Sequence, residues 1–247
     1  MRRPRIIARL DIKNEHVIKG IQLEGLRKIG EPNAMAVGYY SDGADELLFM
    51  DAVASLYERN GVLEIVEGAC RDVFVPITVG GGIRSVQDIE AALRAGADKV
   101  AINTAAFRSA TLIDTAARYF GSQCIVGSVE AKKRDGHWEA FTETGRQETG
   151  VDAVEWARRL EAQGAGEIMV TSIDRDGTKK GYDIELLRQV RDAVSIPVIG
   201  SGGAGSAAHV AAAFSETDAD GLAVATALHY GKTTIRDIKN LIHGAAA

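Results

Sequence analysis

Cysteine, proline and long apolar runs are scarce in this chain of 247 residues. Its 2 cysteines, Cys70 and Cys124, cannot form the set of several disulfides that is typical of small secreted proteins. A transmembrane helix needs about 20 consecutive apolar residues, whereas the uncharged apolar stretches here are only as long as single β-strands. The first residues, MRRPRIIARLDI, also lack the long apolar core and the cleavage site of a signal peptide. We therefore expect a cytoplasmic protein that does not enter a membrane.

Positive charge is not in excess either, with 29 lysines and arginines against 34 aspartates and glutamates and a net charge of −5. This balance argues against general binding of nucleic acid, although it is compatible with a local basic patch for an anionic ligand. The 5 histidines are dispersed and match no zinc-binding spacing, and Asp174 with Asp176 in one loop is weak evidence for a metal. We expect no metal and no other cofactor.

A hydrophobic content of 46% and a charged content of 26% are typical of a globular protein. With only 4 prolines, the chain contains no linker and no low-complexity tract that would mark a boundary. We expect one domain over residues 1–247, long enough to bury a large core.

The second half of the chain repeats the first. Residues 5–13 (RIIARLDIK) align with residues 124–132 (CIVGSVEAK), an offset of 119, which places Glu130 at the position of Asp11. Three further segments match at nearly the same offset, among them the glycine pairs 81–82 and 202–203. Each match is weak alone, and together they indicate an internal duplication.

Short apolar runs alternate with stretches of helical periodicity, a pattern that predicts a parallel sheet. The predicted strands cover residues 6–11, 46–51, 76–80, 98–102, 124–130, 167–171, 197–201 and 220–225. The predicted helices cover residues 32–42, 58–71, 85–95, 109–120, 151–163, 183–193, 205–216 and 233–243. Eight strand–helix units in a duplicated chain predict a (β/α)8 TIM barrel built from two (β/α)4 halves.

In such barrels the active site lies at the carboxyl ends of the strands. Strands three and seven are followed by glycine pairs, Gly81 with Gly82 and Gly202 with Gly203, and strands four and eight by hydroxyls. Glycines let backbone N–H groups approach an oxyanion, and hydroxyls add donors. One glycine pair alone is more often a tight turn, but two equivalent sets predict two phosphate sites and a ligand with a phosphate at each end.

Asp11 and Glu130 end strands one and five, on opposite sides of an eight-stranded barrel. Opposed carboxyl groups suit general acid and base catalysis, although Lys13 and Lys132 would equally hold them as rim ion pairs. Asp176, in the loop after strand six, is a third candidate. Lys19 lies in the glycine-punctuated segment 13–30, which is either a lid over the site or a solvated surface loop.

Several stretches carry a resemblance to a known family: TVGGGIRS (78–85), ADKV (97–100), INTA (102–105), FGSQC (120–124), DAVEW (152–156), DRDGT (174–178) and SGGAG (201–205). Over nearly its whole length the chain resembles the cyclase subunit family of imidazole glycerol phosphate synthase, from histidine biosynthesis. The resemblance implies a lyase-cyclase that takes ammonia and a doubly phosphorylated ribulosyl aminoimidazole carboxamide ribotide. The products would be imidazole glycerol phosphate and aminoimidazole carboxamide ribotide. The predicted substrate-binding residues are Lys19, Gly81, Gly82, Asn103, Thr104, Thr171, Gly177, Ser201, Gly202, Gly203, Ala225 and Thr226.

The family draws ammonia from a glutaminase subunit on the opposite face of the barrel, through a gate of four charged residues. The matching residues here are Arg5, Glu46, Lys99 and Glu167. Asp98 and Gln123 lie in segments that resemble the docking face. These charges start four strands and could equally form a salt-bridge plug, but such a plug is costly to desolvate, so we expect a gate and a glutaminase partner.

Three residues depart from the family pattern. Glu130 stands where aspartate is usual, and the extra methylene moves its oxygens by about a bond length, in a setting where misplacement of about 1 Å can cost 10²-fold in rate. Arg9 stands where the family has a small cysteine. It shares a strand face with Asp11 and needs a carboxylate partner, either Asp11 or Glu130, and it would narrow the ammonia route. Thr226, in place of serine, keeps the hydroxyl.

Other functions stay open at this point. A diverged paralogue would pass glutaminase-derived ammonia to another acceptor, such as a bacterial surface sugar, and Arg9 and Glu130 favour it. A non-catalytic subunit that binds phosphate and channels ammonia would bind the ligand without turnover. The sister isomerase of the same pathway works alone, so the four-charge gate argues against it.

Overall fold

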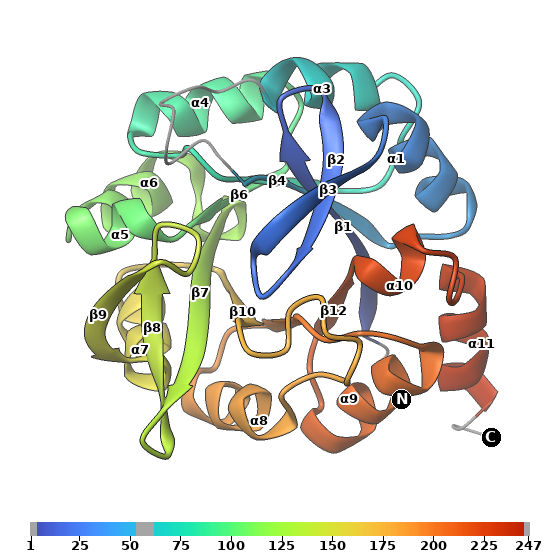
Figure 1. The fold of residues 1–247 in the computed structure, drawn as a ribbon. Coiled ribbons are helices and arrows are strands. Elements are labelled where there is room, and N and C mark those ends of the chain that lie inside the picture. The colour runs from blue at the N-terminus through green and yellow to red at the C-terminus, as the bar shows by residue number, and fades with distance from the viewer. Residues whose placement is uncertain (1–3, 53–61, 245–247) are drawn as a thin grey trace.

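Eight parallel strands close into a barrel in the computed structural model, which describes residues 4–52 and 62–244 (Figure 1). The strands follow the order of the chain, and the pairs β7–β10 and β1–β12 complete the ring. They are β1 (Arg5–Lys13), β4 (Glu46–Asp51), β5 (Ile77–Gly80), β6 (Lys99–Ile102), β7 (Ile125–Arg134), β10 (Glu167–Ser172), β11 (Val198–Ser201) and β12 (Gly221–Val224). The predicted TIM barrel is confirmed, and each strand lies within about two residues of its predicted start.

Helices surround the barrel and cover the outer face of the strands (Figure 1). The main ones are α1 (Pro32–Ser41), α3 (Val62–Ala69), α4 (Val86–Arg94), α6 (Leu112–Phe120), α7 (Ala153–Ala162), α8 (Ile184–Ala193), α9 (Ala207–Thr217) and α11 (Ile235–Gly244). The short helices α5 (Thr104–Arg108) and α10 (Thr226–His229) follow β6 and β12 and were not predicted. The predicted helix 58–71 is described only from residue 62 onward.

Polar side chains set the starts of several helices. Ser85 caps α4 with a capping box in which its hydroxyl accepts from the Asp88 N–H while the Asp88 carboxylate accepts from the Ser85 N–H. Asp152 caps α7 by accepting from two backbone N–H groups, and Ser206 caps α9. Side-chain caps of this kind satisfy N–H groups that have no partner inside the helix.

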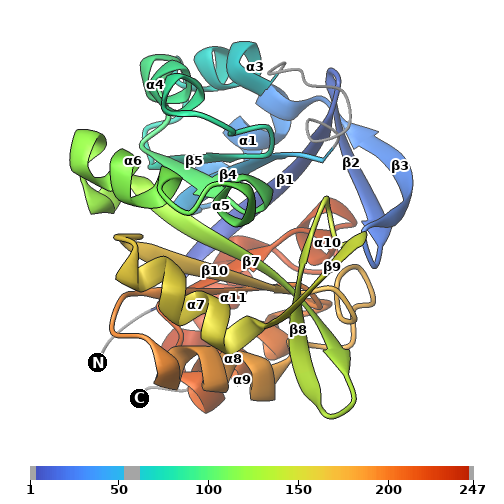
Figure 2. The same ribbon diagram turned by 90° about the vertical axis from the view of Figure 1, so that its left-hand side faces the viewer.

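Two antiparallel hairpins rise from the carboxyl-terminal end of the barrel, one in each half (Figure 2). The strands β2 (His16–Ile21) and β3 (Glu24–Gly30) extend β1, and β8 (His137–Thr142) and β9 (Gln147–Asp152) extend β7. Residues 13–30 were interpreted as a lid or a solvated surface loop, and the strands β2 and β3 within them were not predicted. Asp135 and Gly136 form the turn between β7 and β8, and both adopt positive φ, as a tight two-residue turn requires. The Asp-Gly pair is a sequence signal for such a turn, so β8 could have been predicted.

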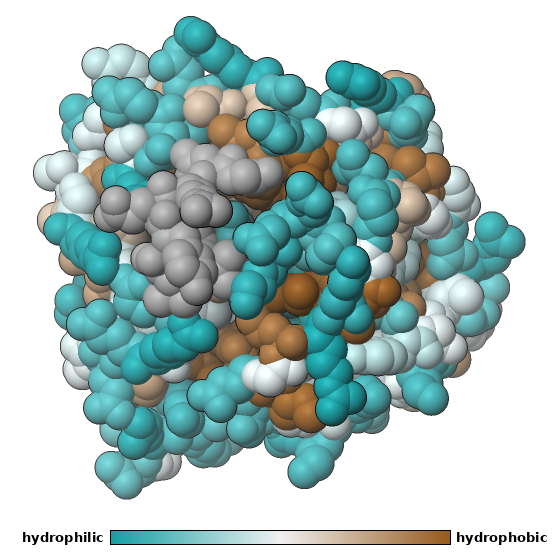
Figure 3. Space-filling view, turned by 45° about the horizontal axis from the view of Figure 1, so that its top comes forward, coloured by the Kyte–Doolittle hydropathy of each residue, from teal (hydrophilic) through white to brown (hydrophobic). Residues whose placement is uncertain are grey.

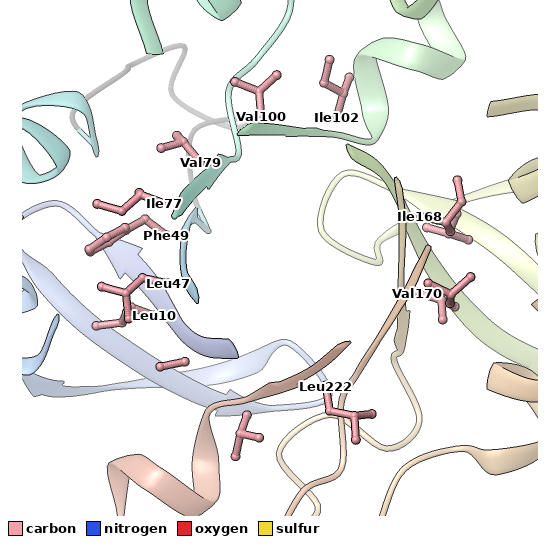
Figure 4. Packing of buried hydrophobic residues seen from close by; sticks show 14 of the residues in the cluster. Leu10, Leu47, Phe49, Ile77, Val79, Val100, Ile102, Ile168, Val170 and Leu222 are labelled. Atoms are coloured by element: carbon pink, nitrogen blue, oxygen red, sulfur yellow. The ribbon is translucent and has the colours of Figure 1, made fainter. Parts of the chain in front are cut away.

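Alternation along the strands separates an outer from an inner core. Leu47, Phe49, Ile77 and Val79 point away from the barrel axis toward the helices (Figure 4). Their neighbours in sequence point inward, as the two-residue period of a strand requires. The inner apolar layer consists of Ile7, Leu48, Ala101, Val126, Met169, Ile199 and Ala223.

Hydrophilic side chains cover most of the face seen in Figure 3, and hydrophobic ones gather there in small groups. Among the helices that the structure describes, none combines the length and the apolar character needed to cross a membrane. The large hydrophobic side chains that remain exposed in the described ranges are Ile21, Phe74, Tyr119, Tyr230 and Leu241.

Two glycine-to-alanine changes should have opposite effects on stability. Gly38 lies within α1, and a β-carbon there meets no atom within 4 Å. A β-carbon on Gly166 would lie 2.2 Å from the backbone oxygen of Ser122. Gly38→Ala should raise the free energy of unfolding by about 0.5–1 kcal/mol, and Gly166→Ala should lower it by about 1–3 kcal/mol. Urea unfolding followed by circular dichroism measures both, and equal effects would contradict this account of the packing.

Candidate active site

Four buried charged groups form a continuous network at the carboxyl-terminal end of the barrel. Arg9 Nε donates to Asp11 Oδ1 at 2.8 Å, and Lys19 Nζ donates to Asp11 Oδ2 at 2.9 Å. The same Lys19 Nζ lies 3.0 Å from Asp176 Oδ1 and 3.1 Å from Asp176 Oδ2. Two cations thus alternate with two carboxylates, so each buried charge has a partner of opposite sign.

Three separate segments bring these groups together. Arg9 and Asp11 lie on β1, Lys19 on β2, and Asp176 in the loop after β10. The hairpin is tied to that loop because the Gln22 N–H donates to the Asp176 carbonyl at 2.9 Å. Lys19 is therefore 3% exposed and lies inside the site, as a lid residue would, on the hairpin strand β2.

Gly177 allows this close approach. Its φ is +70°, and a β-carbon there would lie 2.3 Å from the Gly20 carbonyl oxygen of the hairpin. Only glycine combines that backbone conformation with the missing side chain. The predicted role of Gly177 in substrate binding stays a prediction, and the structure gives it a role in docking the hairpin.

Arg9 reaches across the barrel interior from β1. Its Nη1 donates to Thr171 Oγ1 at 3.2 Å and to Ser201 Oγ at 3.0 Å, on β10 and β11. Of the two carboxylates considered as its partner, it pairs with Asp11. Burial favours the neutral acid, but Arg9 and Lys19 outweigh it and hold the pKa of Asp11 far below its usual range. Asp11 is therefore an anion at any physiological pH.

Glu130 is the equivalent residue of the second half and has the opposite tendency. Burial raises the pKa of Glu130 to about 7, despite the nearby charge of Arg9 and a hydrogen bond at 2.8 Å from the Gly145 N–H to its Oε2. The alternative that Lys13 and Lys132 hold the two carboxylates as rim ion pairs is wrong for Asp11, which pairs with Arg9 and Lys19. Lys132 Nζ lies over the Phe141 ring, 5.9 Å from its centre. One carboxyl group is thus fixed as an anion and the other titrates near neutrality.

A cavity of about 240 Å³ opens beside these groups. It reaches the first predicted phosphate site, where Gly81 and Gly82 have φ of +83° and +76°. A β-carbon on Gly81 would lie 2.2 Å from the Asp51 carbonyl oxygen, so the turn requires glycine. Asn103 also lines the cavity, and its Oδ1 is buried without a hydrogen-bond partner.

The second predicted phosphate site lies across the network. A smaller cavity of about 10 Å³ is lined by Ser201, Gly202, Gly203, Ala225 and Thr226, together with Arg9 and Asp176. Gly202 and Gly203 have φ of +92° and +107°, which repeats the conformation of the first glycine pair. The two predicted sites therefore flank the carboxylates from opposite halves of the barrel.

Residues that the sequence prediction did not include also line the larger cavity. Arg84 follows the first glycine pair, Arg108 ends α5, and Arg146 lies in the turn between β8 and β9. Ser128 lies on β7, two residues before Glu130. These arginines place guanidinium groups beside the cavity that could contact an anionic ligand, and Arg108 pairs with Glu143 at 2.6 Å. Arg84 belongs to the recognised TVGGGIRS stretch, whereas nothing local marked the other two.

The four residues predicted as a gate form a closed ring at the amino-terminal end of the barrel. Arg5 pairs with Glu46 at 2.5 Å and also with Glu167. Lys99 Nζ lies 3.2 Å from Glu46 Oε2 and 3.0 Å from Glu167 Oε2. Each carboxylate thus contacts both cations, and the ring spans β1, β4, β6 and β10.

The two predicted docking residues lie exposed near this end. The Asp98 carboxylate accepts from the Ile77 N–H at 2.8 Å just before β6 starts. Gln123 Nε2 donates to the Phe120 carbonyl at 3.2 Å in the turn before β7. Their position fits a docking face, and their contact with a partner stays a prediction.

Comparison with known proteins identifies relatives over most of the chain. The family model described as "Histidine biosynthesis protein" matches residues 5–234. A Legionella pneumophila protein named imidazole glycerol phosphate synthase subunit HisF is 61% identical over 202 residues, which cover 81% of this chain and 95% of the relative. Proteins of the same name from Myxococcus xanthus and Nostoc sp. are 51% and 45% identical, over 96% and 97% of this chain and 94% of each relative.

The pKa of Glu130 predicts a pH-dependent effect of Glu130→Gln on stability. Between pH 4.5 and about 7 the unfolded state releases this proton and the folded state keeps it, so the free energy of unfolding of the wild type falls as the pH rises. Glutamine has no carboxyl group to titrate, so the free energy of unfolding of the variant lacks this dependence on pH. The variant should therefore match the wild type near pH 4 and exceed it by up to roughly 3 kcal/mol at pH 8.

Urea unfolding at several pH values measures this difference. Glu90→Gln, which removes an exposed carboxylate paired with Arg94 on α4, is the matched control and should show no such trend. A Glu130→Gln effect that does not change with pH would contradict the raised pKa.

Proposed function

The chain belongs to the histidine biosynthesis family, among the relatives named imidazole glycerol phosphate synthase subunit HisF, and from this premise we propose that it is the ammonia-dependent cyclase subunit of that synthase. The substrate would be the doubly phosphorylated ribulosyl aminoimidazole carboxamide ribotide. The observation that supports this activity best is the pair of glycine-rich sites on either side of two carboxyl groups, of which one is held as an anion and the other has a raised pKa. We also propose that the chain acts as one domain in the cytoplasm, where such phosphorylated intermediates are made.

The two ends of the substrate are anchored first. One phosphate is bound by the N–H groups at Gly81 and Gly82, with Asn103 and Thr104. The other is bound at the second site, which contains Gly202, Gly203, Ala225 and Thr226. Anchoring both ends places the ribulosyl carbonyl and the scissile bond between Asp11 and Glu130, and this positioning lowers the entropic part of the barrier.

The charge states assign the proton transfers. Ammonia adds to the ribulosyl carbonyl, and loss of water gives an imine. Asp11, held as an anion by Arg9 and Lys19, accepts a proton as the new ring closes. Glu130, with a pKa of about 7, gives a proton to the departing ribotide. After product release Asp11 loses the proton it accepted to water and Glu130 takes one up from water, so both groups return to their starting states. Asp176 keeps Lys19 in place through its own ion pair.

We propose that ammonia comes from a glutaminase subunit that docks over Asp98 and Gln123. The ring of Arg5, Glu46, Lys99 and Glu167 then lies between the two active sites. A ring in which both carboxylates touch both cations closes the barrel, so passage of ammonia requires at least one pair to separate.

Turnover with ammonium salt tests the cyclase activity directly. The purified chain, supplied with a high concentration of ammonium salt at mildly alkaline pH, should consume the ribulosyl bisphosphate, as followed by loss of substrate absorbance. Asp11→Asn removes the fixed anion and should lower turnover by at least about 10²-fold, while calorimetry should still detect substrate binding.

Asp114→Asn is the matched control, because Asp114 pairs with Arg118 on the outside of α6. It should keep wild-type turnover. Substrate binding without turnover by the wild type would overturn the cyclase proposal and favour a subunit that only channels ammonia. Turnover retained by Asp11→Asn would remove Asp11 from the mechanism.

Lys99→Met tests the gate against the alternative of a structural plug. The change leaves Arg5 as the one cation that both ring carboxylates share, so glutamine-driven turnover in the reconstituted complex should fall or lose its coupling to glutamine hydrolysis. Ammonium-driven turnover should stay within about twofold of the wild type, because that ammonia enters at the mouth. Lys239→Met, which removes the ion pair with Asp45, is the control. Equal loss in both assays would identify the ring as a plug.

A further inference from the structure

Arg9 breaks the two-fold symmetry of the barrel interior. By the internal repeat, the residue equivalent to Arg9 is Ser128, because both precede a candidate catalytic carboxylate by two positions. Ser128 is a small side chain that lines the larger cavity. Arg9 instead extends from β1 to the hydroxyls of Thr171 and Ser201. The guanidinium therefore covers the half of the interior that is formed by β10, β11 and β12.

The cavity on the side of Ser128 is larger than the cavity on the side that Arg9 covers. The larger one, about 240 Å³, is lined by residues of β1, β4, β6 and β7 and extends down to Ala101 in the inner apolar layer. The repeat equivalent of Ala101 is Ala223, on β12. Both alanines are 3% exposed, but Ala223 faces only the cavity of about 10 Å³. Two equivalent alanines thus differ in the free space above them, and Arg9 lines both spaces.

The unequal free space over Ala101 and Ala223 affects the path that a small molecule can take from the ring of Arg5, Glu46, Lys99 and Glu167 to the carboxylates Asp11 and Glu130. Above the ring lies the inner apolar layer, and above that layer lie Arg9 and Ser128. A small neutral molecule that moves along the axis meets a hydrogen-bonded guanidinium over Ala223 and open space over Ala101. Breaking the contacts of a buried cation is costly, so the open side is the easier route.

We propose that ammonia leaves the barrel axis over Ala101, beside Ser128 and Glu130, and that Arg9 is a positioning residue that closes the half over Ala223. The inference rests on the ammonia-dependent function proposed above. The inference adds that ammonia arrives on the side of Glu130, and that Arg9 directs it there.

Leucine substitutions at the two equivalent alanines test the route. In the complex with the glutaminase, Ala101→Leu should lower the ratio of glutamine-driven to ammonium-driven turnover by about tenfold, because it fills the open side. Ala223→Leu should leave that ratio within about twofold of the wild type. If leucine prevents folding at either site, valine at both positions provides the same comparison. An equal loss for both variants, or a larger loss for Ala223→Leu, would overturn the proposal.

Ordered water in high-resolution crystals of the isolated chain gives a readout that needs no activity. Polar and charged groups line both spaces, so their free volume should hold ordered water. The wild type should show several waters over Ala101 and at most one over Ala223, and Arg9→Ala should add waters over Ala223. Several waters over Ala223 in the wild type, none over Ala101, or no new water in Arg9→Ala would overturn the division. Absence of ammonium-driven turnover with the expected waters would reject the proposed cyclase and leave the division intact.

Discussion

The need to pair every buried charge at the carboxyl-terminal end of the barrel determines much of this structure. Arg9 and Asp11 have little exposed surface, so each must find a partner within the protein. Arg9 finds hydroxyls on β10 and β11, and Asp11 finds Lys19, which brings the first hairpin over the mouth. Asp176 then ties the loop after β10 to that hairpin. Satisfying four charges thus connects both halves of the barrel.

Gene duplication alone would give two equivalent halves, and the chemistry proposed here needs them to differ. Asp11 and Glu130 occupy equivalent strand positions, yet only Asp11 has two cations in contact with it. Glu130 accepts a hydrogen bond from the backbone N–H of Gly145. The environment of each carboxyl group, rather than its residue type, therefore separates an anion from an acid that titrates near neutrality.

The barrel and the strand ends could be predicted because they depend on local pattern. Short apolar runs predicted the positions of the strands, and the glycine pairs predicted the turns that require positive φ. The strands β2 and β3 could not be predicted in the same way. In the turn between β1 and β2, Asn14 is followed by glutamate instead of glycine, and the turn between β2 and β3 places Gln22 and Leu23 at positive φ without a glycine. The partner of Arg9 was also undetermined, because strand alternation places Asp11 and Glu130 on the same interior. Arg108 and Arg146 reach the cavity only through the tertiary fold.

The first hairpin depends on the charges beneath it. A two-stranded hairpin is marginally stable in water by itself, and this one is held by Lys19 and by the Gln22 contact to the loop after β10. The roof of the cavity is thus anchored by the same ions that would meet the substrate. A ligand that draws Lys19 away from either carboxylate loosens its own enclosure, so occupancy of the cavity and order of the hairpin are thermodynamically linked.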